Sequence, residues 1–350
     1  MRAGVLGLTM LALGACGGTT RTGGTGTGSS TSGFVGAPGA GVERDVVVSN
    51  EAWTFDRAEG RLITTAHYRV FTTEKEPITI SRLPRFLELA LDHYRSAIVP
   101  LPAPPVKLDV FLMDNRDQWK RLTLQMMGRE GERYHRIGRG GFAHGGRAFL
   151  WDIGVFDTLA IAAHEGWHQY TQRTFRDPLP IYMEEGLASF MEGHRWAGNT
   201  PVFLPWSNLE RYDRLRTAHA RRELVPLSRL LSEAPQDLLA GAGDEALRYY
   251  AQVWALMHFL NEGEGGAYRE GLRNLLLDAE QGKVREVVRV RFGERGLAAL
   301  FARRGSLVLE AYLPKSLEEV DREYGVFVSR LVAAGSRDRI VQGQSPNEKR

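Results

Sequence analysis

Two histidines and a glutamate lie close together in the middle of the chain, in the segment HEGWH at residues 164–168. His164 and His168 are four residues apart in the apolar run 156–170, which predicts a helix. Their imidazoles therefore project from one face and can hold one ion. A zinc ion bound by two imidazoles and a carboxylate keeps a position for water and lowers the pKa of that water towards about 7. Glu165 would accept the proton as general base, and this combination is the chemistry of peptide hydrolysis.

The third metal ligand must be another histidine, an aspartate or a glutamate, because Cys16 is the only cysteine in the chain. After a proline-containing break at 177–180, the run IYMEEGLASF at 181–190 predicts a second helix with carboxylates in its first turn. These carboxylates belong to Glu184 and Glu185. Successive helical residues point about 100° apart, so the two cannot both bind one ion equally well.

The HEGWH segment and the following Glu-Glu-Gly together resemble the gluzincin clan of zinc metallopeptidases, in which a downstream helix supplies a glutamate. The resemblance implies that Glu185, directly before a glycine, binds zinc with His164 and His168. Glu184 is then expected to be a solvated or substrate-side carboxylate. The 16 residues between His168 and Glu185 are fewer than in thermolysin-like members and are closer to bacterial peptidase-MA-like proteins. The specific part of the resemblance covers residues 164–190.

A further run, YYAQVWALMHFL at 249–260, resembles the helix of gluzincin aminopeptidases whose tyrosine hydroxyl donates to the oxyanion. The alignment implies this role for Tyr250 and places Gln252 where those enzymes have a lysine, so the Lys-Gly of the family pattern is absent. The alternative is that Tyr249 and Tyr250 only pack at the start of a buried amphipathic helix. His258 is expected to be a core or helix-face histidine rather than a ligand.

The glycine-containing stretch 140–143 and a predicted strand at 147–151 stand where this clan has the edge strand that pairs with an extended substrate. A peptide added there would bind through main-chain hydrogen bonds, and a plain loop is the alternative. His135, His144 and His194 have no ligand spacing to the motif, so we expect surface or structural roles for them.

The spacing of apolar residues predicts an α+β fold, and the resemblance makes the expectation a zincin-like one. A lobe with a mixed sheet and the active-site helix is expected to about residue 175, followed by a mostly helical lobe. Both lie in one domain at 42–334, before a frayed polar tail at 335–350. The expected strands are 46–48, 62–71, 106–113 and 147–151, and the expected helices are 82–97, a run from about 116, and helical patterns from 156 to 331.

The first residues predict a targeting signal. An apolar run at 3–15 follows Arg2 and ends in the tetrapeptide LGAC, which resembles the bacterial lipobox. The resemblance implies that Cys16 carries diacylglycerol and that the protein faces the extracytoplasmic side of a membrane in the bacterial cell envelope. A plain secretory signal is the alternative. Residues 16–41 are nearly all small or polar, which predicts a flexible tether.

The net charge and the candidate site together reduce the classes of function that fit this sequence. With 45 basic and 42 acidic residues the net charge is +3, which provides no dominant surface for nucleic acid. We therefore expect a zinc-dependent peptidase acting on a peptide or protein. One alternative is a non-catalytic zincin-like envelope lipoprotein that binds metal or a partner, although structural zinc needs no base such as Glu165. Another is a binding module without metal, which burial of the two histidines in the core would favour.

Cys16→Ser is expected to move the protein from the membrane fraction to the soluble fraction of cells. Stable anchoring of this kind needs more than one acyl chain, and none can be attached without the thiol. Fractionation followed by immunodetection measures the change, with the parent protein extracted by detergent as the control. A variant that stays in the membrane fraction would contradict the lipid anchor.

Overall fold

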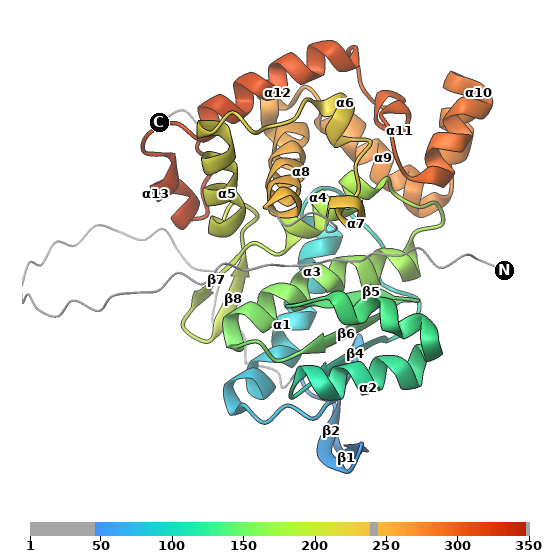
Figure 1. Ribbon diagram of the computed structural model, residues 1–350, viewed down its shortest axis with the longest axis vertical. Helices are drawn as coiled ribbons and strands as arrows, with labels where there is room; N and C mark the ends of the chain where they lie inside the picture. The colour runs from blue at the N-terminus through green and yellow to red at the C-terminus, as the bar shows by residue number, and fades with distance from the viewer. Residues whose placement is uncertain (1–45, 239–243, 348–350) are drawn as a thin grey trace, which may run out of the picture.

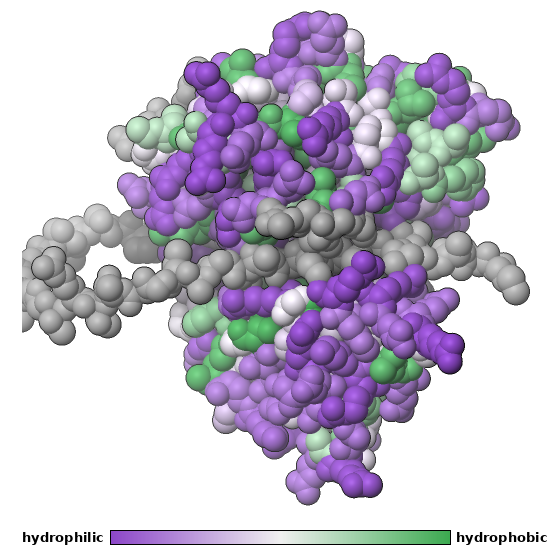
Figure 2. Space-filling view, in the orientation of Figure 1, coloured by the Kyte–Doolittle hydropathy of each residue, from purple (hydrophilic) through white to green (hydrophobic). Residues whose placement is uncertain are grey.

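The computed structural model describes residues 46–238 and 244–347, so the targeting segment, Cys16 and the tether lie outside the described residues. None of the helices within those ranges has the length and apolar character needed to cross a bilayer. Figure 2 shows a largely hydrophilic face, on which apolar residues form only scattered patches.

A six-stranded mixed sheet forms the centre of the N-terminal lobe. Its strand order is β1-β2-β3-β4-β6-β5, in which the β3–β4 and β4–β6 pairs are parallel and the others antiparallel. β5 is therefore an edge strand. The strands are β1 Ser49–Phe55, β2 Ala58–Thr64, β3 Tyr68–Thr72, β4 Leu108–Met113, β5 Gly141–His144 and β6 Arg147–Trp151.

Helices cover both faces of the sheet. Alternate residues of a strand point to opposite faces, so each strand contributes side chains to two separate cores. Val110 and Leu150 belong to the larger core with α1 and α3, whereas Phe111 and Phe149 belong to a smaller aromatic core with α2 and the 3₁₀ helix η1. Figure 1 shows α3 above β5, β6 and β4, and α2 below these three strands. The helices are α1 Pro77–Ser96, α2 Arg116–Met127, η1 Gly128–Arg136 and α3 Val155–Thr174.

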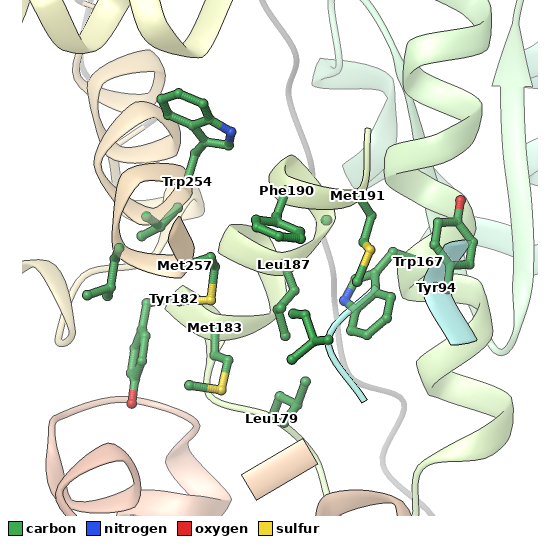
Figure 3. Packing of buried hydrophobic residues seen from close by; sticks show 14 of the residues in the cluster. Tyr94, Trp167, Leu179, Tyr182, Met183, Leu187, Phe190, Met191, Trp254 and Met257 are labelled. Carbon is green, nitrogen blue, oxygen red and sulfur yellow. The ribbon is translucent and has the colours of Figure 1, made fainter. Parts of the chain in front are cut away.

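The helical lobe is joined to the sheet lobe through α4, which packs against both α3 and α8. Figure 3 shows Leu187 and Phe190 of α4 between Trp254 of α8 and Trp167 of α3. A Cβ on Gly186 would lie 2.7 Å from the carbonyl oxygen of Val253, so this glycine permits the close approach of α4 and α8. The helices are α4 Ile181–Met191, α5 Leu209–Ala220, α6 Leu227–Leu230, α7 Pro235–Leu238, α8 Glu245–Glu262, η2 Gly263–Gly266, α9 Arg269–Gln281, α10 Val284–Ala302, α11 Leu307–Glu310, α12 Leu317–Leu331 and α13 Ser336–Val341.

The coarse α+β class predicted from the sequence is confirmed, with several local corrections. The strand expected at 46–48 is wrong, because β1 begins at Ser49. The stretch 62–71 belongs to two strands, β2 and β3, which are paired antiparallel. The first helix begins at Pro77, five residues before the expected start, because the side chain of Glu76 caps it. The glycine-containing stretch includes the short strand β5 rather than a loop alone.

Two corrections concern the C-terminal half. The helical pattern after α3 is interrupted by a hairpin of β7 His194–Ala197 and β8 Thr200–Phe203, which packs against α1. The expectation of a frayed tail is wrong for 336–341, which forms α13. Ile340 in that helix is fully buried, so tertiary packing stabilises a helix too short to be stable alone.

Candidate metal centre

The helix that carries the HEGWH segment is held tightly against α1. Gly166 lies where a Cβ would be 2.6 Å from the hydroxyl of Tyr94, and that hydroxyl donates a hydrogen bond to the carbonyl of Ala163 at 2.6 Å. A larger residue than glycine would push the two helices apart. The close packing therefore fixes the direction in which the histidines of α3 project.

The three predicted ligands meet at the contact of α3 and α4. One donor atom from each of His164, His168 and Glu185 can be chosen so that all lie within 4.8 Å of one another. The Oε2 of Glu185 is 3.4 Å from the Nε2 of His164 and 3.5 Å from the Nε2 of His168. None of the three residues is more than 2% exposed. This set of two imidazoles and a carboxylate is a donor set typical of zinc.

Each histidine has its other ring nitrogen beside a carboxylate. The Nδ1 of His164 is 2.7 Å from Oε2 of Glu192, and the Nδ1 of His168 is 3.1 Å from Oε1 of Glu184. Because a carboxylate only accepts, each Nδ1 carries the proton. In the neutral imidazoles the Nε2 lone pairs therefore remain for an ion, and such carboxylate–histidine pairs are what orients metal ligands in proteins.

These two carboxylates are held by further polar groups. Glu192 accepts hydrogen bonds from Nδ2 of Asn208 at 2.6 Å and from Nε of Arg211 at 3.0 Å. Glu184 accepts from the hydroxyl of Thr171 at 2.6 Å, and Arg303 forms an ion pair with it at 3.8 Å. The expectation that Glu184 is solvated or faces the substrate is therefore wrong, because this side chain is buried against His168.

The electrostatic surroundings keep the carboxylates ionised. Burial alone would raise the pKa of Glu185, but His168 and His164 beside it lower that pKa to about 2. Burial opposes ionisation of Glu192 in the same way, and Arg211 together with His164 lowers its pKa to about 2. Both side chains therefore carry a negative charge at neutral pH.

Tyr250 is the tyrosine of α8 whose ring contacts a predicted metal ligand. Its ring centre is 6.1 Å from that of His164, whereas Tyr249 contacts the ring of Tyr250 instead. Burial, followed by the charge of Glu185, raises the pKa of Tyr250 well above its usual value, so the phenol keeps its proton. Within the described part of the chain, no group forms a hydrogen bond with its hydroxyl. Glu165 is also fully buried on α3.

The remaining predicted residues have structural roles. Gln252 exchanges two hydrogen bonds with the backbone of Val225, so it takes no part in the metal centre. His258 is buried and stacks on Trp206 with ring centres 3.5 Å apart, which confirms the core prediction. The other three histidines considered lie outside the ligand group among the residues described; they are His135, His144 and His194.

Sequence reasoning missed the polar residues behind the ligands. Glu192 could have been predicted, because it follows Glu185 by seven residues and so lies on the same helical face two turns later. Arg211 and Arg303 come from distant helices, and no local pattern indicates that their side chains approach α3 and α4. No model of a known protein family and no curated protein matches this chain.

Glu185→Ala is expected to remove zinc far more completely than Glu184→Ala. The first change deletes one of three protein ligands, whereas loss of a carboxylate that orients a histidine typically costs about 10- to 100-fold in metal affinity. Zinc content after dialysis, measured by atomic emission, tests which variant loses more zinc, and Glu318→Ala at an exposed position is the control. If Glu185→Ala retained more zinc than Glu184→Ala, the third ligand would be Glu184 instead.

Proposed function

We propose that this protein is a zinc-dependent peptidase of the zincin-like type, with His164, His168 and Glu185 as ligands and Glu165 as general base. The observation that carries the proposal is the convergence of two Nε2 atoms and a carboxylate oxygen in a buried space. The Nε2 of His164 and the Oε2 of Glu185 lie 3.4 Å from each other, and neither forms a well-directed hydrogen bond within the described ranges. Such buried polar atoms are costly unless something binds them.

The charges around the ligands support a divalent cation. Four buried carboxylates, from Glu165, Glu184, Glu185 and Glu192, surround the two imidazoles. Two guanidinium groups take part, in the ion pairs of Arg211 with Glu192 and of Arg303 with Glu184. Burial lowers the pKa of His164 and of His168, but the carboxylates beside them raise both pKa values overall, so the site favours positive charge on the imidazoles. A bound dication would take the place of those protons, because zinc binds neutral imidazoles and releases their protons.

The residues of the chain then have separate tasks in peptide hydrolysis. Zinc, when bound, supplies a Lewis acid that polarises a carbonyl and acidifies water. Glu165 follows His164 directly on α3, accepts the proton released by the attacking water and passes it to the leaving amine. Tyr250 keeps its phenolic proton and can donate a hydrogen bond to the developing oxyanion.

The edge strand β5 supports an extended peptide as the substrate. It packs beside α3 and is the last strand of the sheet. A peptide could bind there as an added strand, through main-chain hydrogen bonds that require no particular side-chain sequence. We also propose that Cys16 anchors the protein at the envelope membrane, so that its substrates are extracytoplasmic peptides or proteins.

The burial of His164 and His168 favours a second candidate, a binding module that holds no metal. In a metal-free core of this kind the two imidazoles would hold protons, because burial lowers their pKa values by less than the carboxylates beside them raise those values. The third candidate is a protein that binds metal but is not a catalyst. Zinc analysis of the purified chain distinguishes the metal-free protein from the two metal-binding candidates. The next experiment distinguishes the peptidase from the non-catalytic metal protein.

Glu165→Gln is expected to abolish cleavage of a mixed peptide library while zinc content stays at the parent level. The amide has nearly the same shape but cannot accept a proton. In contrast, His164→Ala should lose both zinc and activity. If a chelator-sensitive cleavage persists at the parent rate in Glu165→Gln, then Glu165 is not the base.

Tyr250→Phe is expected to lower the maximal rate about a hundredfold to a thousandfold, because one oxyanion donor is worth roughly 2.7 to 4 kcal/mol. Apparent substrate binding and zinc content should change little, since the interaction forms mainly in the transition state. Tyr249→Phe is the matched control and should keep the parent rate. Equal rates for both variants would mean that these tyrosines only pack.

A further inference from the structure

Arg303 connects the last helices of the chain to the segment that begins α4. It follows α10 in a left-handed conformation, with φ of 57°. Its carbonyl accepts a hydrogen bond from the amide of Ile181 at 2.9 Å, and its Nε donates to the carbonyl of Leu179 at 2.7 Å. Both the backbone and the side chain of Arg303 therefore hold the residues that lead into the metal-binding carboxylates.

The same guanidinium extends to the carboxylate behind a metal ligand. Its Nη2 is 3.8 Å from Oε2 of Glu184, and both side chains are 11% exposed. The other oxygen, Oε1, accepts from Thr171 and lies beside Nδ1 of His168. The two oxygens of one carboxylate thus face an arginine on one side and a metal-ligand histidine on the other. Without a counter-charge, a buried carboxylate would be driven to move towards another partner or towards water.

We propose that Arg303 is a positioning residue of the metal centre, which holds the imidazole of His168 through Glu184. The last helices of the chain thereby determine the geometry of a site whose ligands all precede residue 186. This inference rests on the proposed zinc site and adds a residue that the HEGWH and Glu-Gly patterns do not contain.

The backbone at Arg303 indicates that the side chain matters. Residues that end a helix in the left-handed conformation are most often glycine, which adopts it without steric cost. Arg303 occupies such a position and uses its guanidinium to contact Leu179 and Glu184. Its neighbour Arg304 instead pairs on the surface with Asp237, so the two adjacent arginines provide a matched comparison.

The test measures metal binding by the purified full-length chain. Zinc affinity is measured by competition with a chelating indicator, and the visible absorption of the Co²⁺-substituted protein reports the geometry of the ligands. Arg303→Met should weaken zinc binding about 10- to 100-fold and alter the Co²⁺ spectrum, as loss of a group behind a ligand does. Arg303→Gly, which suits the backbone conformation, should have the same effect. Arg304→Met should match the parent.

A double-mutant cycle determines whether Arg303 acts through Glu184. In a Glu184→Gln background there is no charge to balance, so adding Arg303→Met should weaken zinc binding by less than about twofold. An equal loss in both backgrounds would overturn the proposal, because the arginine would then act on the chain segment alone. Parent-like affinity and spectrum in Arg303→Met would also overturn it. A parent chain that binds neither ion would instead refute the zinc site itself, and with it this inference.

Discussion

Four carboxylates lie at the packed contact of α3 and α4, where bulk water does not solvate them, and the structure around them serves to balance their charge. Glu184 and Glu192 are each paired with a histidine on one side and an arginine on the other. Glu185 faces both Nε2 atoms. Removal of any partner leaves a charge in a medium of low polarity, which is far more costly than loss of an ordinary surface ion pair.

The need to balance these buried charges explains how the two lobes are joined. The sheet lobe contributes α3 with both histidines, and the helical lobe contributes the two balancing arginines, Arg211 from α5 and Arg303 from the end of α10. Apolar packing of α4 between α3 and α8 brings the lobes together (Figure 3). Because the polar pairs cross the same contact, a shift of either lobe would break ion pairs as well as apolar contacts. The site and the lobe interface are therefore stabilised by the same interactions.

Local sequence patterns were sufficient to predict the two metal ligands that share one helix. The spacing of His164 and His168 depends only on helical geometry, whereas the Glu-Gly step that indicates Glu185 comes from the resemblance to the gluzincin clan. The structure brings these three residues together. The strand β6 was likewise predicted with its observed bounds. The environment of Glu184 was predicted wrongly, because its burial depends on Arg303, which is more than a hundred residues away in the sequence. Sequence spacing carries no information on such contacts, which only tertiary packing creates.

The near-complete burial of the ligands also has a kinetic consequence. With His164, His168 and Glu185 at most 2% exposed, neither an ion nor a peptide can reach them unless the packed elements around them move locally. Exchange would then be as slow as that opening. The identity of the ion would be decided by which metal is present while the chain folds, rather than by the order of equilibrium affinities among divalent metals. The metal content of the compartment in which the chain folds would then set its occupancy.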